Sequence, residues 1–215
     1  MADFQRKIAR IVLEASEPFG FALAGGYAMN EVGLIDRPTK DIDGFTFIFD
    51  PTGFAEAVSV VKRELLKRDF VIEDILTMDF RAAFVVSDNT SDDSTEVELS
   101  YYHRYQDPVR VQDLGLVLST YDLVSGKITA FWERQAPRDY LDINYILQNP
   151  EFTPRELFEM LQQSRTESTL TEFVQALKNA PAWIHEYSTY GLSQKQIDEL
   201  IMHCADAATT LEPED

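Results

Sequence analysis

The segment "RPTKDIDGFTFIFD", residues 37–50, places Asp41 and Asp43 one residue apart at the start of an apolar run. Because residues i and i+2 of a strand point to the same face, this spacing predicts two neighbouring carboxylates, with Ile42 facing the core. Two ionised carboxylates that close destabilise each other unless a cation or a proton intervenes. Their oxygen atoms suit a hard ion such as Mg²⁺ or Mn²⁺. The alternative is a pair of solvated acids at an exposed strand end, and D-x-D alone does not decide between the two.

A second segment, "TEVELS" at residues 95–100, repeats the pattern of carboxylate, apolar residue and carboxylate. In a strand, Glu96 and Glu98 share one face, while Val97 and Leu99 share the other. If this strand lies beside the first, a third carboxylate can meet the aspartate pair. Three carboxylates could then hold divalent ions for phosphoryl or nucleotidyl transfer. The alternative is an amphipathic edge strand whose acidic face is solvated.

Gly25 and Gly26 follow an apolar strand and precede a helix. Glycines at such a turn let the backbone approach a ligand closely, and the helix start offers N–H groups to phosphate. The segment matches neither a Walker A loop nor G-x-G-x-x-G, and a lone glycine pair is often only a turn. Arg37 and Thr39 could supply a charge and a hydroxyl to a triphosphate, although Arg37 could equally form a surface ion pair.

Residues 119–147 hold further candidates at helical spacing. Lys127 and Arg134 are seven positions apart and therefore lie on nearly the same helix face, where Lys127 could either reach an anion or extend to water. Asp139 and Asp142 are three positions apart at the start of the next predicted helix. Acids at that position also suit the helix dipole without any catalytic role.

Hydrophobic periodicity predicts the elements that would position these side chains. We expect helices over residues 4–15, 27–34 and 54–65, strands over 19–26, 42–49, 69–75, 80–86 and 96–102, and an exposed hairpin loop over 87–95. From about residue 119 the pattern is helical, and capping boxes at 153–156 and 193–196 mark two helix starts. The sequence therefore predicts an α/β (α+β) fold in two parts, residues 1–118 and residues 119–215.

The formal net charge of the 215 residues is -18, from 37 acidic and 19 basic side chains. A surface this acidic repels polyanions at long range, which argues against broad, non-specific binding of nucleic acid. A small basic site remains compatible with it, because salt screens fields beyond about 10 Å. The candidates for a local basic path to a tRNA are Arg104, Arg110, Arg134 and Arg138.

The single cysteine, Cys204, excludes an intramolecular disulfide, and its apolar helical surroundings predict a core position. No stretch approaches the roughly 20 apolar residues of a membrane span, so no membrane partner is expected. Charges run through the apolar positions of the N-terminal segment, which is unlike a signal peptide. These features lead us to expect a cytoplasmic protein.

The motifs become specific when they are taken together in order. They are "LAGGYAMNEVGLIDRPTKDID" (23–43), "TEVELS" (95–100) and "DLVSGKITAFWERQAPRDYLDINYIL" (122–147). This order resembles the AbiEii/AbiGii-type nucleotidyltransferases, which are toxin components of bacterial toxin–antitoxin and phage-defence systems. The resemblance covers roughly residues 21–147.

The resemblance implies the polymerase-β-like nucleotidyltransferase fold, a short mixed sheet flanked by helices. Residues 119–147 would complete the active site, and the rest would continue as a helical bundle. Between Glu96 and Glu98 we choose Glu98 as the third carboxylate, since its neighbours Val97 and Leu99 best fit the core face. Carried over by position, the site consists of catalytic Asp41, Asp43, Lys127 and Asp139, nucleotide-binding Gly25, Gly26, Arg37, Thr39 and Lys127, and metal-binding Asp41, Asp43 and Glu98.

The implied function is Mg²⁺-dependent transfer of a nucleoside monophosphate from an NTP to a hydroxyl of RNA (tRNA is one candidate) or of a protein. An antitoxin protein is an expected partner. Tyr27 follows the glycine pair where the family commonly has serine or threonine, and the third acid is a glutamate where aspartate is commoner. These departures leave open an alternative, a catalytically weak or inactive nucleotide- or partner-binding protein on the same fold.

Overall fold

The computed structural model describes residues 2–212. Its contacts divide these residues into two compact units, one formed by residues 2–33 and 37–123 and the other by residues 34–36 and 124–212. The chain passes from the first unit to the second within helix α4, Thr120–Arg134. The short segment 34–36 belongs to the second unit because Leu34 and Ile35 are buried and Tyr145 donates a hydrogen bond to the Asp36 carbonyl oxygen (2.6 Å).

The first unit is built on a mixed sheet, which confirms the predicted α/β class. Within residues 2–212 seven strands form this sheet, in the order β3-β4-β5-β2-β1-β7-β6. Strands β2 and β5 are parallel, as are β1 and β7, and the remaining neighbours are antiparallel. The strands are β1 Phe21–Ala24, β2 Asp41–Thr46, β3 Val71–Met78, β4 Arg81–Ser87, β5 Ser94–Tyr101, β6 Val109–Val111 and β7 Gly115–Val117.

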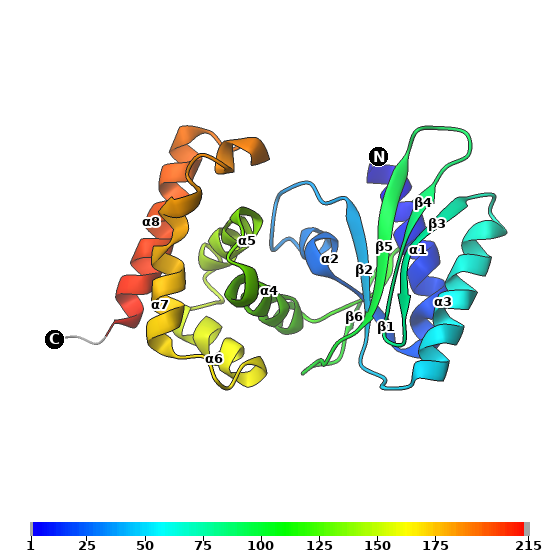
Figure 1. Ribbon diagram of the computed structural model, residues 1–215, viewed down its shortest axis with the longest axis horizontal. Coiled ribbons are helices and arrows are strands. Elements are labelled where there is room, and N and C mark those ends of the chain that lie inside the picture. Colours follow the sequence, from blue (N-terminus) through cyan, green and yellow to red (C-terminus); the bar gives the residue numbers. More distant parts are fainter. Residues whose placement is uncertain (1, 213–215) are drawn as a thin grey trace. The chain divides into compact units, whose positions relative to one another are not determined.

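Helices α1, Ala2–Ser16, and α3, Pro51–Leu66, lie side by side against one face of the sheet, while α2, Gly25–Glu31, lies on the other side (Figure 1). Alternate residues of β2, β4 and β5 point toward α1 and α3. Phe84 of β4 lies beneath the Lys62 ammonium of α3, and its register neighbours Val97 and Ile42 are fully buried on the same face. Alternation along the strands therefore turns the acidic residues of β2 and β5 to the face away from α1 and α3.

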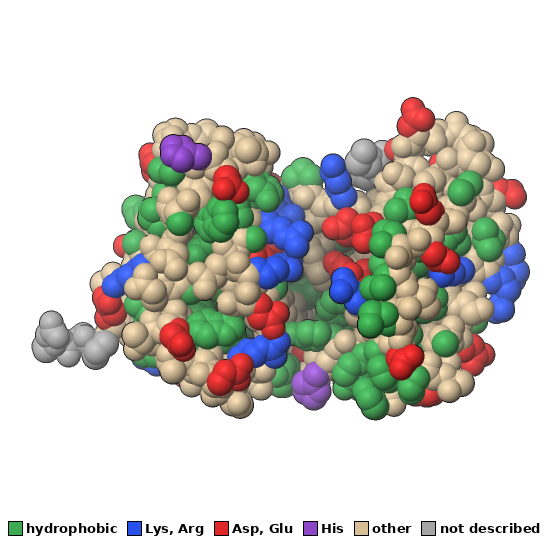
Figure 2. Space-filling model, in the orientation of Figure 1, with side chains coloured by type: hydrophobic (Ala, Val, Ile, Leu, Met, Phe, Trp, Pro, Cys, Tyr) green, Lys and Arg blue, Asp and Glu red, His purple; other side chains and the backbone are tan. Residues whose placement is uncertain are grey.

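Strand β2 ends earlier than its apolar sequence predicts. The expected strand 42–49 is wrong at its C-terminal end, because β2 stops at Thr46, where its pairing with β1 and β5 ends. Phe47, Ile48 and Phe49 are therefore exposed (45%, 42% and 72%), and the Phe49 ring stacks on Phe80 with 4.4 Å between ring centroids. Figure 2 shows hydrophobic side chains gathered at the lower edge of the sheet-bearing unit, over the segment that joins β2 to α3.

The second unit is helical. The expected capping boxes are confirmed: the Thr153 hydroxyl accepts a hydrogen bond from the Glu156 N–H (3.2 Å), and Ser193 does the same for Gln196 (3.4 Å). Cys204 is fully buried, as expected, and burial raises the pKa of its thiol to about 12. Besides the end of α4, the helices are α5 Pro137–Leu147, α6 Pro154–Ser164, α7 Leu170–Lys178 and α8 Gln194–Leu211 (Figure 1).

Over the described part of the chain, no helix combines the length and the apolar content needed to cross a bilayer.

Candidate active site

The two acidic strands are neighbours, as the sequence hypothesis requires. Strands β2 and β5 run parallel, with Asp41 opposite Glu96 and Asp43 opposite Glu98. All four carboxylates are therefore on the same face of the sheet, in two adjacent rows. The Asp41 side chain is exposed and that of Asp43 is half-buried, so the face is open to a ligand at this point.

Two side chains fix the start of β2, where the aspartates begin. The Thr95 hydroxyl donates a hydrogen bond to the Lys40 carbonyl oxygen (2.7 Å), and the Gln5 amide of α1 donates to the Asp41 carbonyl oxygen (3.3 Å). Both hydrogen bonds are made to backbone oxygens, and neither uses the Asp41 carboxylate. The aspartate pair therefore stands on a restrained strand instead of a loop, which is the condition for a precise binding geometry.

The glycine turn lies directly against Asp43. Gly25 has a φ of +65°, and a Cβ added there would lie 1.7 Å from Asp43 Oδ2. Only a residue without a side chain allows both this backbone conformation and this approach. A Cβ at Gly26 would lie 2.9 Å from Thr39 Cγ2 and 3.5 Å from Arg37 Nη2. The structure thus brings both predicted glycines together with Asp43, Arg37 and Thr39.

Asn30 of α2 holds the loop that carries Arg37 and Thr39. Its amide donates to the Arg37 carbonyl oxygen (2.7 Å) and more weakly to the Thr39 hydroxyl (3.5 Å), and its own oxygen accepts from the Arg37 N–H (3.4 Å). No motif in the sequence indicated Asn30 as a site residue. Its position four after Gly26, next to Glu31 at the end of α2, is the local signal that could have indicated it.

A second residue that the sequence analysis missed is Arg81 of β4. Its Nε and Nη2 atoms donate to the two carboxylate oxygens of Glu98 at 3.0 and 2.7 Å, and the Ser100 hydroxyl donates to the same carboxylate at 2.9 Å. The carboxylate of Glu98 raises the pKa of Arg81, with smaller contributions from Glu96 and Asp43. Only the register of the β4–β5 hairpin, counted outward from its loop, could have indicated this pair.

The Tyr27 hydroxyl interacts with other side chains of the protein and is not available to a phosphate group. The side chain is 8% exposed, and burial raises the pKa of its phenol to about 12. The hydroxyl interacts with the side chains of Glu31 and Arg6, which also form an ion pair with each other (2.5 Å). The serine or threonine hydroxyl usual at this position is therefore not replaced by the tyrosine hydroxyl.

Lys127 and Asp139 belong to the second unit. The Lys127 ammonium lies 2.9 Å from a carboxylate oxygen of Asp142, which is buried. Asp139 is also buried, and its oxygens accept hydrogen bonds from Arg134 (2.5 Å) and from the Ala136 N–H (3.1 Å) at the start of α5. Of the two acids, it is Asp142 that contacts the lysine, whereas the contacts of Asp139 tie the end of α4 to the beginning of α5.

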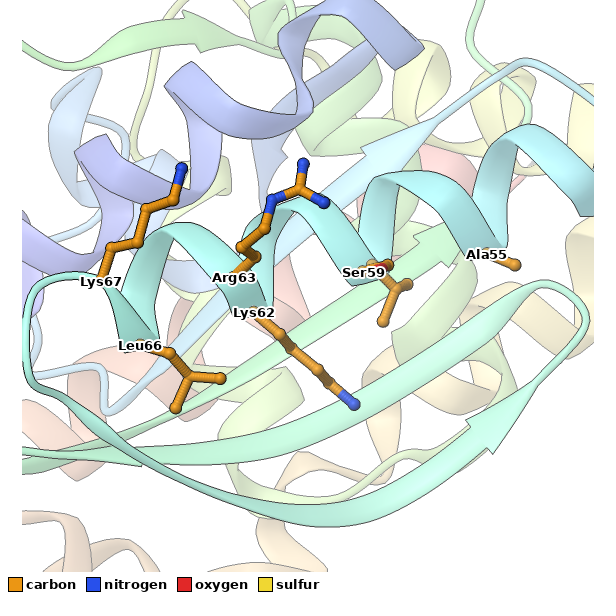
Figure 3. A pocket seen from close by; sticks show the side chains of 7 residues that line it. Ala55, Ser59, Lys62, Arg63, Leu66 and Lys67 are labelled. Atoms are coloured by element: carbon orange, nitrogen blue, oxygen red, sulfur yellow. The ribbon is translucent and has the colours of Figure 1, made fainter.

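A shallow groove runs along the outside of α3, on the opposite face of the sheet from the carboxylates. Figure 3 shows Lys62 and Leu66 pointing toward the β3–β4 strands, with Arg63 and Lys67 on the other side of the helix. Lys62 is paired with Asp74 (2.5 Å). Helix and sheet separate this groove from Asp41 and Asp43, so it forms no part of the candidate active site.

The arginines proposed for a basic path are largely neutralised. Arg110 is paired with Glu17, Arg134 with Asp139, and Arg104 covers the Phe47 ring (3.8 Å from the centroid) and lies 3.9 Å from Asp107. Arg138 is exposed. Ion pairs of this kind reduce the attraction that these side chains can offer to RNA phosphates.

The carboxylates of β2 and β5 are suitable ligands for a divalent cation, and the strand register places them side by side. Their side chains, however, are not oriented toward one common point. Asp41, Asp43 and Glu98 supply hard oxygen ligands from adjacent strands. In residues 2–212 no three acidic, histidine or cysteine side chains converge closely enough to enclose a metal ion. At this site the carboxylate of Glu98 is hydrogen-bonded to Arg81.

Comparison with known proteins identifies the fold and the family of the chain. No curated protein matches the chain. Two crystal structures have a similar fold: JHP933 from Helicobacter pylori (14% identity, TM-score 0.63, covering 95% of this chain and 89% of that one) and an H. pylori protein described as a candidate nucleotidyltransferase (13%, 0.64, 95% and 92%). The model of the family "Nucleotidyl transferase AbiEii toxin, Type IV TA system" matches residues 12–206. The chain therefore belongs to the AbiEii nucleotidyl transferase toxin family and is a nucleotidyltransferase.

Proposed function

We propose that the protein transfers a nucleoside monophosphate from an NTP to a hydroxyl of an RNA or a protein, with Mg²⁺ as cofactor, and that it acts as the toxin of a toxin–antitoxin system. The observation that carries this proposal is the contact between the Gly25 turn and the Asp43 carboxylate. A backbone turn that a phosphate group can approach closely thus lies next to the carboxylates of β2 and β5. Metal-dependent transfer from a triphosphate needs both features.

The residues of the first unit divide between the cation and the triphosphate. Asp41, Asp43 and Glu98 would hold the divalent cation, which when bound neutralises charge on the phosphates and orients them. The Gly25-Gly26 turn gives the triphosphate access to backbone N–H groups. Arg37 and Thr39, held over Gly26 by Asn30, supply a charge-assisted and a neutral hydrogen bond to its oxygens.

In the second unit, Lys127 is proposed to bind the nucleotide, by resemblance to the family. Its partner Asp142 orients the ammonium from a buried position. The resemblance assigns the role of the later catalytic carboxylate to Asp139. The contact with Lys127 favours Asp142 for the same catalytic role. Comparing the transfer rates of Asp139→Asn and Asp142→Asn decides between the two, provided that both variants remain folded.

The direct test removes the aspartate pair. With an α-labelled NTP, Mg²⁺ and a lysate or RNA pool, we expect Asp41→Ala combined with Asp43→Ala to abolish transfer of label. A control variant, Glu56→Ala combined with Asp92→Ala, loses two exposed acids of the same unit and should keep full activity. If the Asp41/Asp43 variant labels its target as well as the unaltered protein does, the assignment is wrong.

The same assay identifies the acceptor and the nucleotide. The label should appear with one or more of the four NTPs, and the labelled product should be removed either by ribonuclease or by protease. The paired state of Arg104, Arg110 and Arg134 favours a protein hydroxyl over a long RNA contact. Loss of the label with ribonuclease alone would instead select RNA.

A second candidate function follows from Tyr27. Because its hydroxyl is occupied by Glu31 and Arg6, one expected phosphate contact is missing, which favours a weak or inactive nucleotide-binding protein. Such a protein would show a rise in melting temperature with NTP and Mg²⁺ but no transfer of label. Replacing the residue by serine, Tyr27→Ser, should then raise transfer if the missing hydroxyl is the cause.

A further inference from the structure

We propose that Arg81 substitutes for the divalent cation on Glu98 while the protein is free of metal, and that the displacement of Arg81 sets the affinity of the site for the metal. The inference rests on the proposed function, because it concerns the same carboxylates. It makes Arg81 a positioning residue, which acts on the metal through Glu98.

The first support is that Arg81 uses the whole carboxylate of Glu98. Nε and Nη2 of the guanidinium each bind a different carboxylate oxygen (3.0 and 2.7 Å), and the Ser100 hydroxyl adds a third bond (2.9 Å). Forked pairs of this type are stronger and more directional than single hydrogen bonds. A metal ion that uses Glu98 must therefore replace these bonds.

The second support is that the sheet gives Glu98 two sides to which it can turn. Strand β5 lies between β4 and β2, and Glu98 is opposite Ala83 on one side and Asp43 on the other. The small Ala83 side chain leaves room for the glutamate to lean toward Arg81, which stands two residues further along β4. Leaning the other way brings the carboxylate toward Asp43 and the cation.

The third support concerns the ease of exchange. The Arg81 side chain is 56% exposed and that of Glu98 is 23% exposed, so both can be solvated once they separate. Because the pair is partly solvated, its net free energy is smaller than that of a fully buried pair, which makes displacement by a doubly charged ion feasible. An arginine side chain stays charged in proteins, so the guanidinium leaves Glu98 by moving and not by losing a proton.

The test measures binding of Mn²⁺ to the whole protein without nucleotide, by electron paramagnetic resonance of the free ion. We expect Arg81→Gln to bind Mn²⁺ about three- to tenfold more tightly than the unaltered protein, since exposed pairs are worth up to about a factor of five and forked pairs somewhat more. Arg63→Gln, in the groove on the other face, loses the same charge and should change the affinity less than twofold.

A double-mutant cycle with Glu98→Gln separates displacement from long-range charge. In the Glu98→Gln background, the effect of Arg81→Gln should fall to that of Arg63→Gln. An effect that persists there, or an Arg81→Gln variant that binds Mn²⁺ no more tightly than the unaltered protein, overturns the inference. If the Asp41/Asp43 double variant binds Mn²⁺ as well as the unaltered protein, the proposed function fails first, and this inference falls with it.

Discussion

Gly25→Ala is the substitution that tests most directly how the turn and Asp43 depend on each other. A non-glycine residue at a φ of +65° costs about 1–2 kcal/mol from backbone crowding. In addition, the new Cβ would lie 1.7 Å from Asp43 Oδ2, whereas separations below 3.0 Å are essentially never found, so the carboxylate must move by more than about 1 Å. Forcing that side chain off its rotamer adds roughly 1 kcal/mol.

The matched control is Gly33→Ala. Gly33 has a similar φ of +75°, but an added Cβ meets nothing within 4 Å, so only the backbone cost applies. At about 2–4 °C per kcal/mol for a chain of this size, Gly33→Ala should lower the melting temperature by about 2–8 °C, and Gly25→Ala by a few degrees more.

The two variants should differ far more in activity than in stability. A displacement of about 1 Å in a reacting group can cost roughly 100-fold in rate, so Gly25→Ala should lose at least that factor in transfer of label, while Gly33→Ala stays close to the unaltered protein. Both should be assayed well below their melting temperatures. Equal activity of the two variants would refute the reasoning that Asp43 needs the space above Gly25.

Two further predictions concern the second unit. Asp139→Asn should lower the melting temperature, measured by calorimetry, by several degrees. The substitution weakens the buried contacts of Asp139 with Arg134 and with the Ala136 N–H at the start of α5. An unchanged melting temperature would show that these contacts do not stabilise the fold. Cys204 should resist alkylation by iodoacetamide at pH 8 and react fully in denaturant, as measured by mass spectrometry. Burial raises the pKa of its thiol to about 12, so the reactive thiolate does not form in the folded protein. Rapid labelling of the folded protein would contradict this prediction.

The acidic strands were the part of the site that the sequence could predict best. Alternation of carboxylate and apolar residue is a local pattern, and it correctly assigned Val97 and Leu99 to the buried face. The same argument failed beyond Thr46, because the length of a strand is decided by its partners and not by its own apolar residues. Phe47 and Phe49 continue the pattern of β2 but have no neighbouring strand to bind.

Other features depend on contacts that no local pattern records. Strands β6 and β7 have three residues each, too few for alternation to be recognised, and the sequence analysis predicts nothing there. The partner of Glu98 lies 17 positions away, and that of Lys127 lies on the following helix. Both are set by strand register or helix packing, which sequence periodicity does not specify.

The parallel pairing of β2 with β5 also has a consequence for folding. The hydrogen bond from Thr95 to Lys40 joins residues 55 positions apart, and the carboxylate rows meet only when the chain between them has closed into a loop. Long-range parallel pairings form slowly, after local hairpins and helices. During synthesis, a nascent chain that ends before Glu98 therefore carries Asp41 and Asp43 without the strand that completes their site. We therefore expect a prematurely terminated copy to lack the proposed transferase activity.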